Sequence, residues 1–335
     1  MPTVSIIVPC YNEQATIRFL LDAIYAQTYP RPELEVIIAD GLSEDDTRAE
    51  IITFQSEHPD LSLCVVDSPK RIIPASVNQA IENAHGEIII RMDAHSAPNP
   101  EYVERCVKAL ETGMGDSVGG VWDIQPGGKG WLADSIAIAA SHPLGVGDAY
   151  YRHTTQPGYV DTVPFGAFYR SLVERIGMFD ETLLSNEDYE FNTRIRQSDG
   201  RIWLDPAIRS IYFARTTLAS LACQYWRYGY WKMRMVRRYP KSLRWRQALP
   251  PLFVLSLICG VILAIFIPIM WYLVTAEIIT YITLLLVISL LMALGQRKAF
   301  LIVGLPMAIT GMHLSWGSGF LWSIIANIFE KMKND

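Results

Sequence analysis

The sequence predicts an α/β domain with a doubly wound, mostly parallel sheet, followed by helices that cross a membrane. Short apolar runs alternate with segments of helical periodicity through the first part of the chain, which is typical of β-α-β units. Near the other end, Glu277, Arg297 and Lys298 are the only charged residues between Gln247 and Phe329. So long a stretch with so few charges indicates transmembrane helices rather than the core of a soluble domain.

Composition adds little about partners. Half of the 335 residues are hydrophobic and the formal net charge is −5, but the charges are distributed so unevenly that the net value is uninformative. The chain starts without a basic segment ahead of an apolar one, so we expect no signal peptide and a first domain that stays in the cytosol. The five cysteines have no spacing typical of metal ligands, and we expect them to be reduced and mostly buried.

Four buried strands and three helices are expected at the start of the chain. Apolar runs of strand length predict the strands Val4–Pro9, Leu34–Asp40, Leu61–Asp67 and Glu87–Asp93. Asn12 is expected to cap the first helix, and Ser43 with Asp46 resembles a capping box for the second. Pro74 is expected to open a third helix that continues through Ala84.

The middle of the chain, roughly residues 113–164, is rich in glycine, aromatic residues and isolated prolines. This composition predicts loops and short elements around a site. Beyond it, helices are expected over Leu172–Met178 and Glu187–Arg196, and a hairpin or paired strands over Arg201–Phe213. Residues 218–239 predict one long amphipathic helix.

Three apolar runs predict the membrane region. Pro251–Val274 and Ile278–Leu294 are near the length needed to cross a hydrocarbon core. The third run, Ala299–Phe329, is interrupted by glycines and Pro306, and we expect either one span with an interfacial piece or a re-entrant pair. The expected regions are a cytosolic domain at 1–217, a basic amphipathic interfacial region at 218–247 and about three spans within 248–329.

Acidic residues end two of the predicted strands. Asp40 ends the second strand, Asp93 ends the fourth, and His95 follows two residues later. In an open parallel sheet these positions face one crevice, where ligands bind. A carboxylate there can accept a hydrogen bond from a base or ribose, and a carboxylate with an imidazole can hold a divalent cation against a diphosphate. The alternative is that these acids only cap helices, and for Asp40 alone both interpretations stay open.

Six short segments stand in order over about residues 3–230. They are Val4–Glu13, Asp40–Thr47, Pro74–Ile81, Asp93–His95, Asn186–Asp188 and Gln224–Tyr228. In this order and spacing they resemble the motifs of family 2 glycosyltransferases, which have the GT-A fold. Residues Gln224–Lys232, the variant motif Asp93–His95 and the apolar tail most resemble the succinoglycan-type exopolysaccharide transferases.

The resemblance implies a role for each matching residue. The residues implied to bind the nucleotide sugar are Pro9, Tyr11, Glu13, Asp40, Arg71 and Asp93. Asp93 and His95 are implied to hold a divalent cation, Mg²⁺ or Mn²⁺, against the diphosphate. Asp188 is implied to be the general base with Glu187 beside it, and Glu190 competes for that role if the helix is rotated. The alternative for these acids is to complement the helix macrodipole.

The acceptor is expected to meet residues of the second half of the chain. Gly166 offers room for a sugar to approach the backbone, or is an ordinary turn residue. The resemblance implies that Gln224, Arg227 and Tyr228 contribute at the acceptor or membrane interface. Two departures from the family pattern matter. His95 replaces an acid and is a softer ligand, and Tyr228 replaces a tryptophan, which argues against a processive synthase.

Aromatic and basic side chains gather in two further places. Trp122 and Trp131 are expected to stack on a sugar, to close a loop or to be ordinary core aromatics. Basic residues interleave with aromatic ones from Arg227 to Arg246, a pattern that also occurs in nucleic-acid-binding proteins. Because this run precedes the first predicted span, the positive-inside rule and interfacial anchoring explain it better. We therefore expect membrane lipids as partners and no nucleic acid, and the helix could also grip the phosphates of a lipid-linked acceptor.

The resemblance and the apolar tail together predict an inverting glycosyltransferase. It is expected to move a sugar from a nucleotide sugar, a UDP-hexose, to a polyprenyl-linked glycan in exopolysaccharide or surface-polysaccharide synthesis. The alternatives are a polyprenyl-phosphate sugar synthase and a catalytically inactive scaffold that binds sugar nucleotides. The expected location is the inner (plasma) membrane of a bacterium, multi-pass, with the catalytic domain in the cytoplasm.

Overall fold

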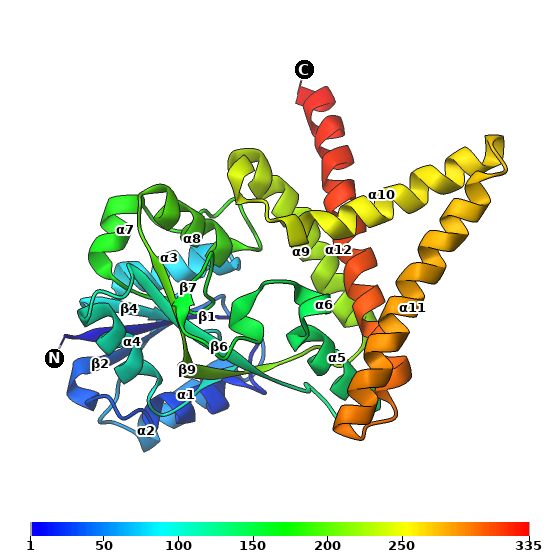
Figure 1. Cartoon of the computed structure of the whole chain (residues 1–335). Coiled ribbons are helices and arrows are strands. Elements are labelled where there is room, and N and C mark those ends of the chain that lie inside the picture. The colour runs from blue at the N-terminus through cyan, green and yellow to red at the C-terminus, as the bar shows by residue number, and fades with distance from the viewer. Residues whose placement is uncertain (1, 335) are drawn as a thin grey trace. The chain divides into compact units, whose positions relative to one another are not determined.

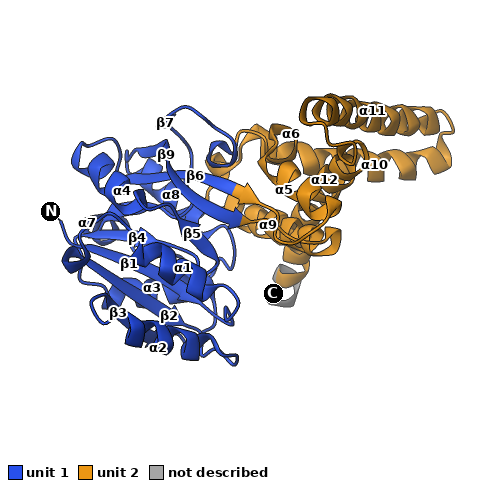
Figure 2. Cartoon of the chain, turned by 90° about the horizontal axis from the view of Figure 1, so that it is seen from below, with its two compact units in different colours: residues 1–123, 149–212 blue, residues 124–148, 213–335 orange. Residues whose placement is uncertain are grey.

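The computed structural model describes residues 2–334, with side chains described as far as Glu330. The chain forms two compact units, which are coloured separately in Figure 2. The first comprises residues 1–123 and 149–212 and carries the sheet. The second comprises residues 124–148 and 213–335 and is almost entirely helical. Each unit has a hydrophobic core of its own.

Within the described residues, one nine-stranded sheet has the order β3-β2-β1-β4-β8-β6-β9-β5, with β7 beside β9. The first four strands are parallel and confirm the prediction, with bounds Val4–Cys10 (β1), Leu34–Asp40 (β2), Ser62–Asp67 (β3) and Ile88–Arg91 (β4). The sheet then becomes antiparallel, because β8 (Ala167–Tyr169) runs against both β4 and β6 (Ser117–Gln125). The remaining strands are β5 (Ser96–Pro98), β7 (Gly158–Tyr159) and β9 (Ile202–Phe213).

Helices cover both faces of this sheet (Figure 1). One face packs on α1 (Ile17–Tyr25), α2 (Thr47–Glu57) and α4 (Tyr102–Glu111). The other packs on α3 (Ile73–Asn83), α7 (Arg170–Ile176) and α8 (Glu187–Gln197).

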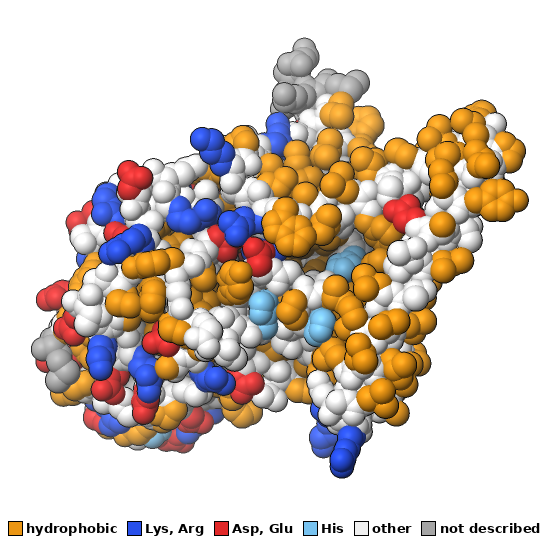
Figure 3. Space-filling model, viewed as in Figure 1, with side chains coloured by type: hydrophobic (Ala, Val, Ile, Leu, Met, Phe, Trp, Pro, Cys, Tyr) orange, Lys and Arg blue, Asp and Glu red, His pale blue; other side chains and the backbone are white. Residues whose placement is uncertain are grey.

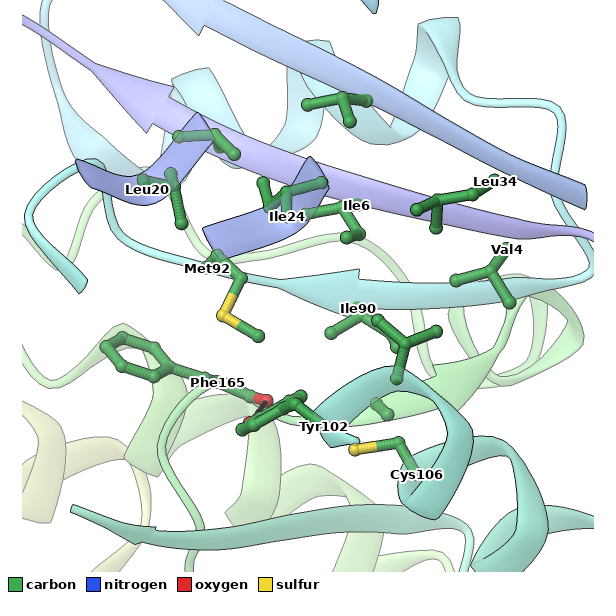
Figure 4. Packing of buried hydrophobic residues seen from close by; sticks show 14 of the residues in the cluster. Val4, Ile6, Leu20, Ile24, Leu34, Ile90, Met92, Tyr102, Cys106 and Phe165 are labelled. Carbon is green, nitrogen blue, oxygen red and sulfur yellow. Dashed lines mark hydrogen bonds between the residues drawn. The ribbon is translucent and has the colours of Figure 1, made fainter. Parts of the chain in front are cut away.

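Strand alternation explains the two layers. Val4 and Ile6 face the α1 side, where Figure 4 shows Ile6 beside Ile24 and Val4 near Leu34, whereas Ile7 faces the α3 side. A strand buried on both faces reads as a continuous apolar run, which is why the sequence revealed it.

Two predicted helix caps are wrong. Helix α1 begins at Ile17 and α2 at Thr47, and neither Asn12 nor Ser43 caps them. Instead, the backbone N–H of Asn12 donates to Ser43 Oγ at 2.9 Å, and the Asn12 side chain accepts from the backbone N–H of Glu44 at 2.8 Å. Short polar side chains bond neighbouring loops as readily as helix ends. These contacts therefore join the loops that follow β1 and β2.

The middle of the chain is more regular than predicted. It contains the long strand β6, the helices α5 (Trp131–Ser141) and α6 (Pro143–Val146) and the short helix Tyr150–Arg152. The sequence did not predict β6 because the strand contains glycines. One of them, Gly120, is packed so closely that a Cβ there would lie 1.8 Å from the carbonyl oxygen of Ile208. Glycine permits this close backbone approach, although its presence usually argues against a strand. Residues 202–213, predicted as a hairpin or paired strands, form the single strand β9.

The second unit is built around α9 (Leu218–Arg238) and α12 (Leu301–Asn334). Their backbones approach closely at two glycines. A Cβ at Gly229 would lie 2.1 Å from the carbonyl oxygen of Trp316, and one at Gly319 would lie 2.2 Å from that of Trp226. Small residues at such crossings let helices pack at short distance. The predicted amphipathic helix is thus confirmed, with α12 as its partner.

Two described helices, α10 (Trp245–Phe266) and α11 (Met270–Gln296), are long and apolar enough to cross a membrane. Only 22% and 17% of their most apolar windows are buried, so they are not core helices of the unit. Figure 3 shows hydrophobic side chains gathered over both helices. The third predicted span is not among these candidates. Of the two expected arrangements, the re-entrant pair is wrong, because α12 is one continuous helix that contains Pro306.

Candidate active site

A buried arginine at the end of β4 gathers three carboxylates. The Arg91 side chain is 3% exposed and donates to Glu187 Oε1 at 2.9 Å and to Asp93 Oδ1 at 3.1 Å. It also donates to Asp188. The strand end supplies Arg91 and Asp93, whereas Glu187 and Asp188 begin α8 almost a hundred residues later. The structure therefore brings together three of the predicted site residues around a fourth residue that was not predicted.

The charges of this cluster perturb its ionisable groups. Burial alone would lower the pKa of Arg91, but the nearby carboxylates of Asp188, Asp93 and Glu187 raise it above its ordinary value. Burial raises the pKa of the Asp188 carboxyl. Arg91 opposes that shift, whereas the negative charges of Glu187 and Asp93 add to it. Asp188 remains 26% exposed, so a substrate can reach it. A reachable carboxyl with a raised pKa suits a general base.

Glu190, the competing candidate base, is held elsewhere. It is buried, and its carboxylate binds Arg194 through both oxygens at 2.7 and 2.9 Å. Arg194 in turn donates to backbone carbonyl groups at the end of α7 and just beyond it. This ion pair ties α8 to the segment after α7, so the geometry favours Asp188 over Glu190 as the base.

His95 lies beside Glu13, with 3.0 Å between its Nδ1 and Glu13 Oε1. A carboxylate on one ring nitrogen fixes the tautomer and orients the other nitrogen, as in many metal-ligating histidines. Among residues 2–334, no group of three or more His, Cys, Asp or Glu side chains is arranged to hold a metal ion. A carboxylate and an imidazole are ligand types that a divalent cation accepts when substrate phosphates and water supply the rest, so the cation role of Asp93 and His95 stays a prediction. Glu13 thus contacts the predicted metal ligand His95, and its predicted role in binding the nucleotide sugar stays a prediction.

The loops after β1 to β3 form the part of the site predicted to bind the nucleotide. The guanidinium of Arg71 lies 5.2 Å from the ring centroid of Tyr11 and donates to Glu44 at 2.8 Å. The Tyr11 ring packs on Gly41, where a Cβ would approach it to 3.1 Å. Pro9 precedes this loop in β1, where it pairs with Ala39 of β2. Tyr11 and Arg71 thus present exposed planar groups on which a base can stack.

Asp40 is the last residue of β2 and is fully buried. Its carboxylate accepts from the backbone and hydroxyl of Ser43 and from Arg48, which also binds Asp67. A nucleotide contact by Asp40 stays a prediction, and it requires the carboxylate to share these partners or exchange them.

Gly166 stands where β8 meets β4, and its carbonyl accepts from the backbone N–H of Arg91 at 3.3 Å. Gly166, Arg91, Asp188 and Asn192 line a small cavity of about 10 Å³, too small for a sugar. Trp122 is packed against Tyr212, with its ring centroid 4.2 Å away and the rings nearly parallel. This stacking is an ordinary core contact, as one of the alternatives for Trp122 predicted.

The remaining predicted residues belong to the second unit. Gln224 and Tyr228 lie one turn apart on α9, and Gln224 Nε2 donates to Tyr228 Oη at 3.0 Å. Arg227 lies on the same helix, and the acceptor roles of these three residues stay predictions. Trp131 begins α5 and is exposed, so it is not a core aromatic.

Sequence reasoning missed two arginines, Arg91 and Arg48. Both join carboxylates that lie in different elements. One signal was available for Arg91, because it closes the apolar strand Ile88–Ile90, and a charge in a buried strand needs a partner. The identity of its partners was not available, since Glu187 and Asp188 follow only after a long intervening segment.

The sequence is similar to a known protein family and to several characterised proteins. Residues 5–177 match the family described as glycosyl transferase family 2. The succinoglycan biosynthesis protein ExoA of Rhizobium meliloti is 32% identical over 323 residues, which are 94% of this chain and 93% of the relative. A dolichyl N-acetyl-α-D-glucosaminyl phosphate 3-β-D-2,3-diacetamido-2,3-dideoxy-β-D-glucuronosyltransferase of Methanococcus voltae is 25% identical over 331 residues, 97% of this chain and 98% of the relative.

Among solved structures, the mannosyltransferase PcManGT from Pyrobaculum calidifontis, in complex with GDP-Man and Mn²⁺, has a similar fold. The TM-score is 0.63 with 21% sequence identity, over 96% of this chain and 87% of that one. The likeness shows that the chain has the GT-A fold.

Proposed function

The chain belongs to glycosyl transferase family 2, and we propose that it is an inverting hexosyltransferase that uses a nucleotide sugar and a lipid-linked glycan acceptor. The observation that carries the proposal is the placement of Asp188. It stands at the start of α8, reachable from solvent, in one cluster with the strand-end carboxylate of Asp93. A carboxylate base beside a diphosphate-binding strand end is what direct displacement at an anomeric carbon requires.

The transfer is a single displacement. Asp188 takes the proton of an acceptor hydroxyl while that oxygen attacks the anomeric carbon of the donor. The bond from this carbon to the diphosphate oxygen breaks, and its electron pair leaves with the nucleoside diphosphate. Attack from the face opposite the leaving group inverts the anomeric configuration.

A divalent cation, when bound, stabilises the negative charge on the leaving diphosphate. Asp93 and His95 are the residues that would hold it, and Glu13 would orient the imidazole of His95. Tyr11 and Arg71 would stack on the base.

The names of two relatives support the acceptor class. The Methanococcus voltae relative is described as acting on a dolichyl phosphate-linked sugar. A Campylobacter jejuni relative, 27% identical over 93 residues, is described as a GalNAc(5)-diNAcBac-PP-undecaprenol β-1,3-glucosyltransferase. We propose a polyprenyl-linked glycan as the acceptor and a UDP-hexose as the donor, in exopolysaccharide or surface-polysaccharide synthesis.

The exposed apolar helices support a membrane location. We propose that α10 and α11 form a hairpin across the inner membrane, with the catalytic domain in the cytoplasm and residues 218–247 at the interface. The basic residues near the start of α10, and Arg297 with Lys298 after α11, then lie on the same side, as the positive-inside rule requires.

A product assay tests the proposal. Membranes that contain the full chain are incubated with a panel of radiolabelled nucleotide sugars and extracted lipid-linked glycans, and the anomeric configuration of the product is determined by NMR. The expected result is label in a lipid-linked glycan with inverted configuration. Label bound directly to the lipid phosphate would favour a polyprenyl-phosphate sugar synthase instead. Donor binding without transfer of any sugar would favour an inactive scaffold.

A further inference from the structure

We propose that Arg91 is a positioning residue of the reaction, which holds the base Asp188 in the orientation that accepts the proton. The inference rests on the proposed function, because it assigns Asp188 as the base. It adds a requirement that the glycosyltransferase motifs of this chain do not include. The requirement is a buried arginine side chain between the base Asp188 and the carboxylate of Asp93.

The first support is the rigidity of the element that carries Arg91. Its backbone pairs with Ile7 of β1, and its N–H donates to the carbonyl of Gly166, so β4 is held on both sides. The carboxylates of Glu187 and Asp188 stand at the first turn of α8, behind Asn186 in a left-handed conformation with φ 66°. A fixed strand therefore supplies the guanidinium that orients two residues just after an irregular turn.

The second support is the geometry of the guanidinium itself. Arg91 uses one terminal nitrogen for Asp188 and the other for Glu187 and Asp93. A planar group with fixed donor directions can orient three carboxylates at once, whereas a lysine ammonium acts as a point charge on a flexible stem. The orientation of Asp188 is thus coupled to that of Asp93, the residue predicted to face the diphosphate.

The third support is the charge count. Three carboxylates around one guanidinium leave two negative charges in a largely buried place. Without Arg91 these carboxylates would repel one another and turn toward solvent. That movement would take the base out of the position in which it accepts the proton.

The test is a double-mutant cycle on the turnover of full-length enzyme in membranes or detergent. The four proteins are the wild type, Arg91→Met, Asp188→Asn and the double variant, assayed at saturating donor and acceptor. If Arg91 acts through Asp188, Arg91→Met lowers kcat by about tenfold or more in the wild-type background. In the Asp188→Asn background it lowers kcat by less than about threefold further.

A second variant and a control keep the test falsifiable. Arg91→Lys keeps a positive charge among the carboxylates and supplies the same cycle if Arg91→Met does not fold. Arg194→Met is the matched control, since Arg194 also pairs with an acid of α8, Glu190, but has no contact with Asp188 among those described. We expect it to lower the melting temperature and to leave the kcat unchanged.

The outcomes separate the two claims. Equal fold-losses of kcat from the Arg91 variants in both backgrounds would mean that Arg91 acts independently of Asp188, and would overturn this inference alone. It is also overturned if both Arg91 variants keep the wild-type kcat. If Asp188→Asn itself keeps the wild-type kcat, the base assignment in the proposed function fails.

Discussion

Replacing Asp188 with asparagine removes a basic carboxylate while keeping the shape of the side chain. The structure indicates what else the change does. The asparagine side chain would still offer an oxygen to Arg91, and the excess negative charge of the cluster would fall, because two carboxylates rather than three would surround one guanidinium. The loss of one charge-assisted hydrogen bond is therefore offset by reduced repulsion. We expect the fold and the donor affinity to be nearly unchanged.

The magnitude of the catalytic loss follows from the role of a general base. Proton abstraction by a positioned side chain contributes about 10² to 10⁴ in rate, which is roughly 2.7 to 5.5 kcal/mol of barrier. An asparagine amide cannot accept the proton, so kcat should fall at least about a hundredfold. Because the pKa of Asp188 is raised and the base works deprotonated, wild-type activity should decline as pH falls through that raised value.

The assay combines single-turnover transfer of radiolabelled sugar with calorimetric titration of the donor and thermal unfolding. Glu190→Gln provides the matched control, since Glu190 lies on the same helix but binds Arg194. It should lower the melting temperature, because a buried ion pair is broken, and leave kcat near the wild-type value. Glu187→Gln completes the series.

Two results would refute the reasoning. If Asp188→Asn retained activity while Glu187→Gln or Glu190→Gln lost it, the base would be a different acid of α8. If all three variants stayed active, direct displacement assisted by a base of this helix would have to be abandoned.

Four further predictions address the cation, the nucleotide, the packing and the topology. EDTA should abolish transfer and Mn²⁺ or Mg²⁺ should restore it, and full activity in chelator would contradict a cation at the end of β4. Asp40→Ala should weaken donor binding by about tenfold in calorimetry with an unchanged circular dichroism spectrum, whereas unchanged affinity would leave Asp40 a purely structural role. Gly319→Ala forces a Cβ toward the carbonyl oxygen of Trp226 and should destabilise the protein by about 1–3 kcal/mol in thermal unfolding. Gly311→Ala in the same helix meets no atom within 4 Å and should cause no loss. Reporter fusions should place Arg297 in the cytoplasm, and an external reporter there would overturn the topology.

Much of the first unit could be predicted because its signals are local. The apolar runs of β1, β2 and β4 are nearly continuous, since those strands are buried on both faces, and Asp93 follows two residues after β4. The start of α8 was likewise visible from periodicity. Family resemblance then indicated which of these acids share a site.

Features that depend on distant partners could not be predicted. Asn12 and Ser43 have the side chains of helix caps, yet they bond each other's loops because β1 and β2 are neighbours. The glycines of β6 suggested a loop. Their actual role, a close backbone approach to β9, depends on tertiary structure and cannot be read from the sequence. The third apolar run contains proline and glycine, but packing against α9 keeps α12 one helix.

Arg91 explains why this site needs positive charge from more than one source. The cluster holds two more negative than positive charges, and a nucleotide sugar brings a negatively charged diphosphate to the same strand end. Like charges at this spacing repel in a partly desolvated place, so Arg91 alone cannot accommodate the donor. A cation held by Asp93 would neutralise the diphosphate and leave Arg91 to orient Asp188. With His95 in place of a second acid, the site carries one negative charge fewer, which lowers the positive charge that donor binding requires.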